Sequence, residues 1–271
     1  MPLHESYQNG YEQLLDYLKK LNHAAVAFSG GTDSTLLLWA AKEVLGNKVL
    51  ALTVKTPYIP DWEIEEATLF CEKYAIRHNI IELPFPEIIR GNPEDRCYKC
   101  KRQLFETLLE EAATNGIDTV LEGTNADDTQ DYRPGYKALK ELAIGSPLLE
   151  SGLTKAAIRV LSKSMGLPTW DKPAYACLLT RLPYNRAVSE NDLVRIEKAE
   201  LFLIRAGYRS VRVRIQDNTA RIEMDSDFIP RFITSGCYKK TTAFLKSIGF
   251  RFVSLDLEGY RKGSFNSTIE T

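Results

Sequence analysis

The chain has 271 residues, of which 44% are hydrophobic, and this length suffices for a sizeable core in one large domain or two unequal ones. Its 35 lysines and arginines nearly balance its 36 aspartates and glutamates, which argues against a polyanion binder that works through overall charge, although a local basic strip remains allowed. No apolar run approaches the length that spans a bilayer, and residues 1–6 lack the features of a signal peptide, so we expect a cytoplasmic protein without a membrane partner.

The first half of the chain alternates between predicted helices and strands. Apolar residues at helical spacing indicate a first helix that ends near Asn22. Strands are then expected at residues 23–28, 49–54, 79–83 and 118–121, and helices at residues 35–41, 61–75 and 92–115. The last of these helices should begin with Asn92 as its cap and Pro93 in its first turn. This alternation predicts an α/β fold, a parallel sheet covered on both faces, which binds ligands at the carboxyl ends of its strands.

The stretch Ala25-Val-Ala-Phe-Ser-Gly-Gly-Thr-Asp-Ser34 joins the first strand to the following helix through two glycines and several hydroxyl groups. Gly30 and Gly31 can adopt backbone angles closed to other residues, so the amides of the turn can converge on an anion. Ser34 adds a hydroxyl near the positive end of the helix dipole. The stretch lacks the lysine of a Walker motif and the glycine spacing of a dinucleotide fingerprint. It predicts a loop for a nucleotide pyrophosphate, the alternative being a plain Gly-Gly turn.

Short polar side chains follow the fourth expected strand. Glu122-Gly-Thr-Asn-Ala-Asp-Asp128 leaves its carboxyl end, and Asp131-Tyr-Arg-Pro-Gly135 continues the loop. Such side chains can hold a ribose, a base edge or a metal ion, and they also form ordinary turns, so both interpretations stay open. A helix at residues 154–165 follows, capped by Thr154 and stopped by Gly166.

The segment from Leu167 to Tyr184 contains several prolines and lacks a clear period, so we expect a loop despite its apolar content. Long ordered loops in compact domains are often functional. The pattern then changes to a helix at 190–206, strands at 210–215 and 220–224, further helices within 228–248 and a strand at 252–257. The two adjacent strands predict a β-hairpin, which the first half lacks, and a domain boundary is expected near residues 184–189.

Five cysteines, an odd number, in a reducing compartment indicate catalysis or metal binding rather than a disulfide framework. Cys97 and Cys100 stand three apart on an expected helix, which puts both thiols on one face, and Cys177 lies in the proline-containing loop. Together they could supply three thiolates to an iron–sulfur cluster with one open iron. The alternatives are a cluster with a fourth protein ligand, a zinc ion in place of the cluster, or cysteines that belong to the apolar stripe of an ordinary helix. Cys71 and Cys237 lack partners at metal-ligand spacing and are expected to be structural.

The segment Val211-Arg-Val-Arg-Ile215 is an alternating strand that carries Arg212 and Arg214 on the same face. Two guanidinium groups on one face form a forked donor array that suits a phosphate or a carboxylate. The alternative is a solvated strand face, and the sequence alone leaves both open.

The pattern Ser-Gly-Gly-x-Asp-Ser at residues 29–34 resembles the PP-loop of the ATP pyrophosphatase superfamily, whose members release pyrophosphate and leave AMP on the substrate. The whole ordered set of motifs resembles the LarE family over about residues 14–266. That set is the PP-loop, the segments at 122–128 and 131–135, Cys177 with Arg181-Leu-Pro-Tyr184, and the strands Val211-Arg-Val-Arg214 and Ala220-Arg-Ile-Glu223. LarE enzymes are ATP-dependent sulfur transferases that build the nickel-pincer nucleotide cofactor of lactate racemase.

The resemblance implies two domains and a reaction. Residues 1–186 would form a PP-loop ATP pyrophosphatase domain of the adenine nucleotide alpha hydrolase-like kind. Residues 187–271 would form a smaller α+β domain for substrate binding and assembly into a homo-oligomer. A carboxylate of pyridinium-3,5-biscarboxylic acid mononucleotide would be activated as an acyl-adenylate and converted to a thiocarboxylate.

The resemblance also assigns roles to individual residues. ATP, with its pyrophosphate and Mg²⁺, would be held by Ser29, Gly30, Gly31, Asp33, Ser34, Gly123 and Asp127. The substrate phosphate would be held by Arg212 and Arg214. Cys177 matches the sulfur-bearing cysteine, and the catalytic positions beside it are Asp33, Arg181 and Glu200.

The cysteine content departs from that of the well-known LarE members. Those members carry only the loop cysteine, which gives up its own sulfur and becomes dehydroalanine. Cys97 and Cys100 instead resemble the second type in the family, in which three cysteines, here with Cys177, bind a [4Fe-4S] cluster. Such a cluster can carry a sulfide and transfer it repeatedly, and the sequence does not identify the sulfide donor.

Three other functions stay open at this point. A PP-loop tRNA thiolase also combines this loop with a three-cysteine cluster, but near-neutral charge and the lack of a Lys/Arg-rich arm disfavour a nucleic-acid partner. An amide-forming PP-loop synthetase that uses ammonia needs none of the cysteines, and a nucleotide-sensing module needs no reaction. The three histidines lie outside the candidate loops, which disfavours hydrolases built on a Ser–His or Cys–His pair.

Overall fold

The structure, a computed structural model, describes residues 3–130 and 134–261. Part of the expected loop at 131–135 and the end of the expected second domain therefore lie outside the described residues. The chain divides into two compact units, of which the first contains Met1–Ile89 and Asp95–Tyr175 and the second contains Arg90–Glu94 and Ala176–Thr271. Each unit has its own sheet and its own helices.

The first unit is built on a four-stranded sheet with the strand order β3-β2-β1-β4. Every neighbouring pair of strands in it runs parallel. The strands are β1 (Ala24–Ala27), β2 (Val49–Lys55), β3 (Arg77–Glu82) and β4 (Val120–Leu121). This arrangement confirms the parallel α/β sheet that the alternation of strands and helices predicts.

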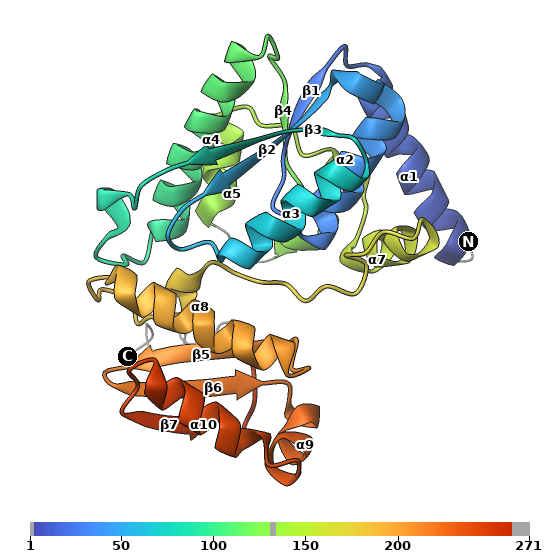
Figure 1. Ribbon diagram of the computed structural model, residues 1–271. Coiled ribbons are helices and arrows are strands. Elements are labelled where there is room, and N and C mark those ends of the chain that lie inside the picture. The colour runs from blue at the N-terminus through green and yellow to red at the C-terminus, as the bar shows by residue number, and fades with distance from the viewer. Residues whose placement is uncertain (1–2, 131–133, 262–271) are drawn as a thin grey trace. The chain divides into compact units, whose positions relative to one another are not determined.

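Helices cover both faces of this sheet, as Figure 1 shows. One face packs against α1 (Leu3–Lys19), α2 (Thr32–Leu45), α3 (Asp61–Lys73), α6 (Pro147–Glu150) and α7 (Lys155–Ser164). The other face packs against α4 (Arg96–Thr114) and α5 (Pro134–Glu141). Successive residues of β1 alternate between the two cores, with Ala24 and Val26 in the first and Ala25 in the second. Burial on both faces explains why the strands are continuous apolar runs.

The strand order of this sheet reverses at β1. From β1 the chain continues to β2 and β3 on one side, and it then returns to β4 on the other side of β1. In open parallel sheets, ligands bind where the strand order reverses in this way. The loops that follow β1 and β4 therefore lie at the expected binding edge of the sheet.

The helix-start signals of the sequence give one wrong and one confirmed prediction. The helix expected to begin at Asn92 begins at Arg96 instead. Asn92 has a φ of 50°, in the left-handed region, and its buried side-chain amide donates to the carbonyl oxygen of Pro183 at 2.8 Å. Its amide is used for this long-range contact, which the local pattern does not reveal. Thr154 does cap α7, since its hydroxyl accepts from the backbone nitrogen of Ala157 at 3.2 Å.

The second unit contains a three-stranded sheet with the order β5-β6-β7. Its strands are β5 (Val211–Gln216), β6 (Thr219–Met224) and β7 (Phe252–Leu255), and its helices are α8 (Glu190–Arg205), α9 (Ile229–Thr234) and α10 (Cys237–Ser247). Strands β5 and β6 form the predicted antiparallel hairpin, with Asp217 at a φ of 51° in the turn, and β7 runs parallel to β6. Over the residues that the structure describes, no helix is both long enough and apolar enough to cross a membrane.

Candidate active site

The loop between β1 and α2 has the features of an anion-binding turn. Gly30 has a φ of 64°, in the left-handed region that favours glycine. Gly31 is the N-cap of the 14-residue α2 and has no side chain that could accept from the first-turn amides. The hydroxyl oxygens of Ser29 and Ser34 lie 3.2 Å apart, so both flank the same turn. Uncapped amides at the positive end of a helix attract an anion.

Asp33, in the first turn of α2, combines an ion pair with a buried oxygen. Its Oδ2 lies 2.5 Å from Nζ of Lys155, the first residue of α7. Its Oδ1 is buried and has no hydrogen-bond partner among the described residues. Burial raises the pKa of the Asp33 carboxyl above its ordinary value, and the positive charge of Lys155 opposes this shift. A carboxylate oxygen beside an anion-binding turn is the kind of ligand that Mg²⁺ prefers.

Gly123 and Asp127, which follow β4, lie beside the same loop. A Cβ atom at Gly123 would come within 3.0 Å of the backbone nitrogen of Ser34, so the lack of a side chain lets the two backbones approach. Asp127 Oδ2 accepts from the backbone nitrogen of Lys155 at 2.7 Å. The structure therefore brings Gly123, Asp127 and residues 29–34 together at one edge of the sheet.

Two lysines that belong to no sequence motif contact this region. One is Lys155, which pairs with Asp33. The other is Lys172, which is 6% exposed and donates to the carbonyl oxygen of Gly30 at 2.9 Å. Lys155 directly follows the predicted cap Thr154, and Lys172 lies in the predicted functional loop. Their positions, next to the predicted cap and within the predicted loop, are the signal by which the sequence could have indicated these two residues as part of the site.

Cys97 and Cys100 lie in the first two turns of α4, on the predicted helix. Cys97 is exposed and Cys100 is partly buried, with its Sγ 3.3 Å from the hydroxyl oxygen of Tyr58. The buried apolar side chains of α4 lie further along the helix, at Phe105 and Leu108 among others. The exposed Cys97 does not fit an ordinary apolar stripe, whereas the partly buried Cys100 leaves this alternative open for itself.

Cys71 and Cys237 have different surroundings from this pair. Cys71 is buried in the core of the first unit, and burial raises the pKa of its thiol to about 12. Burial in the core is what the expected structural role of Cys71 requires, since a buried thiol is held in its less reactive protonated form. Cys237 is partly buried at the start of α10, where its Sγ lies 3.9 Å from the hydroxyl oxygen of Thr241.

The three cysteines of the predicted cluster are divided between the units. Cys97 and Cys100 belong to the first unit and Cys177 to the second. None of the five cysteines, all of which are described, forms a disulfide. Among the described residues, no group of three or more His, Cys, Asp or Glu side chains is arranged as a metal site. The cluster therefore stays a prediction.

A buried ion pair fixes the backbone around Cys177. This residue precedes a single 3-10 turn, Leu178–Arg181, and its carbonyl oxygen accepts from the hydroxyl of Thr180 at 2.9 Å and from Arg181 at 3.2 Å. Arg181 is 1% exposed and Glu200 is 2% exposed, and two nitrogens of Arg181 donate to the two carboxylate oxygens, each at 2.8 Å. Glu200 also accepts from a backbone nitrogen of β5 at 2.8 Å. The loop that carries Cys177 is thereby tied to the sheet of the second unit.

Arg212 and Arg214 share one face of β5, as the alternation predicts, but that face is not solvated. The two residues are 3% and 5% exposed, so the solvated-face interpretation is wrong. Arg214 donates to Oε1 of Glu223 at 2.6 Å and to the carbonyl oxygen of Thr180 at 2.7 Å. Since Thr180 is three residues beyond Cys177, this contact brings the arginine face and the cysteine loop together within the second unit.

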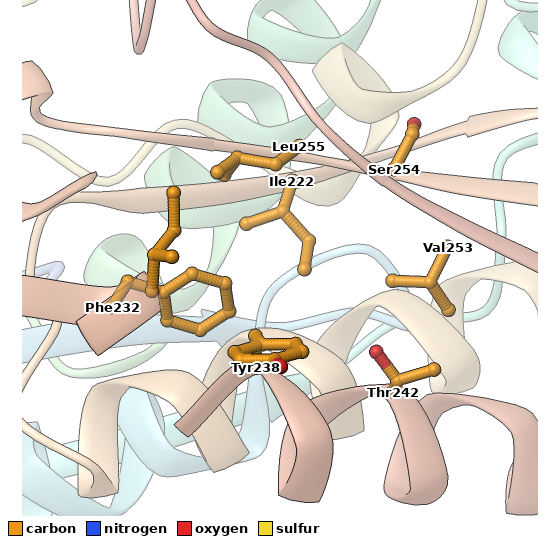
Figure 2. A pocket seen from close by; sticks show the side chains of 8 residues that line it. Ile222, Phe232, Tyr238, Thr242, Val253, Ser254 and Leu255 are labelled. Carbon is orange, nitrogen blue, oxygen red and sulfur yellow. The ribbon is translucent and has the colours of Figure 1, made fainter. Parts of the chain in front are cut away.

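The opposite face of this small sheet is apolar. A pocket of about 230 Å³ lies there. Figure 2 shows the rings of Phe232 and Tyr238 beside Ile222 of β6. None of the residues that line this pocket carries a charge. This pocket offers no positively charged side chain to an anion, so the arginine face is the better site for an anion.

The part of the chain around the loop after β1 matches a known protein family. Residues 23–94 match the family described as Queuosine biosynthesis protein QueC, and this range contains the loop between β1 and α2. Together with the helix-covered parallel sheet, this match confirms a PP-loop α/β fold.

Longer matches extend over nearly the whole chain. An uncharacterized protein of Synechocystis sp. is 39% identical over 261 residues, 95% of this chain and 97% of that protein. The pyridinium-3,5-bisthiocarboxylic acid mononucleotide synthase of Lactiplantibacillus plantarum is 34% identical over 259 residues, 94% of this chain and 93% of that enzyme. An uncharacterized protein of Methanocaldococcus jannaschii is 36% identical over 87% of this chain and 90% of its own length. The chain therefore belongs to the LarE family, that of the Lactiplantibacillus enzyme, and its resemblance to this family is confirmed.

The close approach at Gly123 generates a testable prediction about stability. Gly123→Ala forces the backbone of the β4 loop away from Ser34, and we expect it to lower the free energy of unfolding by about 1–3 kcal/mol. Gly91→Ala is the control, because a Cβ atom there meets nothing within 4 Å, and we expect a change within about 0.5 kcal/mol. Urea denaturation measures both changes. A Gly123→Ala protein as stable as the wild type would contradict the packing described here.

Proposed function

We propose that the protein is an ATP-dependent sulfur transferase that adenylates a carboxylate of pyridinium-3,5-biscarboxylic acid mononucleotide and converts it to a thiocarboxylate. One observation carries this proposal: uncapped helix amides, two hydroxyls and a buried Asp33 oxygen meet in the loop after β1. Membership in the LarE family supports the substrate, because the Lactiplantibacillus relative is named for a bisthiocarboxylic acid mononucleotide.

The loop at residues 29–34 suits the β- and γ-phosphates of ATP. The first-turn amides of α2 can donate to phosphate oxygens, and Lys155 supplies a positive charge beside them. Asp33 Oδ1 would hold Mg²⁺, and the exposed Asp127 would accept from a ribose hydroxyl. A substrate carboxylate oxygen then attacks the α-phosphorus, and the bond to pyrophosphate breaks while the loop keeps the pyrophosphate in place.

The second unit would bind the phosphate of the nucleotide substrate on its arginine face. Arg212 and Arg214 share this face with Arg221, which pairs with Glu223 at 2.8 Å. Arg221 also lies 3.8 Å from Asp256, so three guanidinium groups stand against two carboxylates, which still leaves an excess of positive charge that suits a phosphate. The contact between Arg214 and Thr180 would hold the bound nucleotide near the loop of Cys177.

Arg181 and Glu200 would act as positioning residues. The guanidinium of Arg181 is buried against Glu200 and donates to the carbonyl oxygens of Ala176 and Cys177, at 2.7 and 3.2 Å. These contacts fix the backbone on both sides of the peptide bond that enters Cys177. Arg181 would therefore contribute by orienting the sulfur of Cys177 rather than by touching the substrate.

Three thiolates, those of Cys97, Cys100 and Cys177, are a donor set that suits a [4Fe-4S] cluster with one open iron. When bound, such a cluster supplies a sulfide to the activated carboxyl group. The three cysteines would hold it, the hydroxyl of Tyr58, 3.3 Å from Sγ of Cys100, would donate to that thiolate, and Arg181 would fix the loop of Cys177. Addition of sulfur to the acyl carbon expels AMP, which leaves with the electrons of the broken carbon–oxygen bond.

The proposed reaction is tested with ATP and pyridinium-3,5-biscarboxylic acid mononucleotide under anaerobic conditions. We expect AMP and pyrophosphate to form in equal amounts, and only when the acid is present. Cys177→Ser should still form the acyl-adenylate but no thiocarboxylate, whereas Cys237→Ser, a partly buried cysteine of α10, should behave like the wild type. Thiocarboxylate formation that persists in Cys177→Ser would sink the proposed role of this cysteine. Ammonia-dependent amide formation, or tRNA binding that fades with salt, would instead favour another PP-loop enzyme.

The cluster is tested by anaerobic reconstitution of the purified protein with iron and sulfide. We expect an iron–sulfur absorption band in the wild type, because three thiolates are available, and its loss in Cys97→Ala and Cys100→Ala. Cys237→Ser is the matched control and should retain the band. A wild-type protein that develops no band, or a band unchanged in Cys97→Ala, would remove the cluster from the account.

A further inference from the structure

Lys172 is a buried lysine in the segment that follows α7, and its ammonium group contacts the nucleotide loop. Its Nζ donates to the carbonyl oxygen of Gly30 at 2.9 Å and to Oε2 of Glu66 at 2.7 Å. It also lies 5.4 Å from the ring centre of Trp62. An ammonium group is costly to bury unless it is paired, so these contacts are what keep Lys172 at this position.

The contact with Gly30 determines which way the next amide points. In a trans peptide the carbonyl and the following N–H point in opposite directions, and the described chain contains no cis peptide bond. Because Lys172 holds the Gly30 oxygen on one side, the N–H of Gly31 faces the other side. There it donates to Oγ of Ser29 at 3.4 Å, a long hydrogen bond that a phosphate oxygen in the same turn can replace.

The backbone that carries Lys172 is itself bound to the nucleotide loop and to α7. The hydroxyl of Thr32 donates to the carbonyl oxygen of Thr169 at 2.9 Å. Arg159 of α7 donates to the carbonyl oxygens of Trp170 and Lys172, at 2.8 and 2.7 Å. The hydroxyl of Thr32 also lies 3.5 Å from the carbonyl oxygen of Lys172, so four hydrogen bonds from two elements fix the backbone that positions the ammonium group against the loop.

We propose that Lys172 is a positioning residue for pyrophosphate, which holds the Gly30–Gly31 peptide so that the Gly31 N–H faces the anion. This inference rests on the proposed function, because it takes the loop to bind the pyrophosphate of ATP. The ammonium group is already engaged by Glu66 at 2.7 Å and by the Gly30 oxygen at 2.9 Å, so Lys172 acts through the backbone and not as a direct phosphate ligand.

The test measures the affinity of the full chain for inorganic pyrophosphate, ATP and AMP by calorimetry. Lys172→Met removes the ammonium group and keeps the length of the side chain. We expect this variant to lower the affinity for pyrophosphate and for ATP about tenfold, because a charge-assisted hydrogen bond that orients the loop is lost. The affinity for AMP should stay within about twofold of the wild type. Lys172→Arg, which keeps the charge and a donor, should recover most of the affinity.

Lys163→Met is the matched control for this test. Lys163 is exposed and its Nζ lies 4.4 Å from the ring centre of Trp170, so it contacts the same segment from α7 without touching Gly30. We expect its affinity for pyrophosphate to equal that of the wild type. If Lys172→Met does not fold, Thr32→Val is the second variant, because it removes a hydrogen bond that fixes the same segment. It should lower the affinity for pyrophosphate about threefold and leave the affinity for AMP unchanged.

Two results would overturn this inference while leaving the proposed function intact. One is a pyrophosphate affinity in Lys172→Met within about twofold of the wild type. The other is an equal loss of affinity for pyrophosphate and for AMP, which indicates a general structural defect. A wild-type protein that binds neither ATP nor pyrophosphate is a different result, because it refutes the proposed function and this inference together.

Discussion

The site depends on one constraint, which is that the first-turn amides of α2 require an acceptor that Gly31 cannot supply. The strand order places the loops after β1 and β4 around these amides. Gly123 lets the β4 loop approach their backbone, and Asp33 and Lys155 place opposite charges beside them. Lys172 holds the preceding peptide from the other side. Each of these features is explained if an anion completes the loop.

The second unit depends on the buried pair of Arg181 and Glu200 in a comparable way. A buried charge without its partner costs about 3–5 kcal/mol, so neither side chain can be removed alone without a large loss of stability. The unit maintains this pair where it fixes the carbonyl of Cys177 and the edge of β5. Such a cost is understandable if the position of the Cys177 sulfur matters for chemistry, as the LarE family relationship suggests.

Local pattern was enough to predict the parallel sheet, the glycine turn after its first strand, the hairpin and the shared face of the two arginines, because each depends on residues close together in the chain. It failed where tertiary contacts decide. Asn92 has the composition of a helix cap but adopts a left-handed conformation to bind Pro183. The burial of Arg212 was not visible, because strand alternation does not say what covers each face. Lys172 stands 142 residues from the glycine that it contacts, so no motif includes both.

The proposed cluster of Cys97, Cys100 and Cys177 would deliver sulfur to the substrate without the loss of Cys177. Mass spectrometry of the intact protein before and after turnover with ATP and the biscarboxylic acid mononucleotide tests this claim most directly. The cluster route predicts an unchanged polypeptide mass after many turnovers. A loss of about 34 Da, the mass of the hydrogen sulfide given up when a cysteine becomes dehydroalanine, would contradict it and show that Cys177 is consumed.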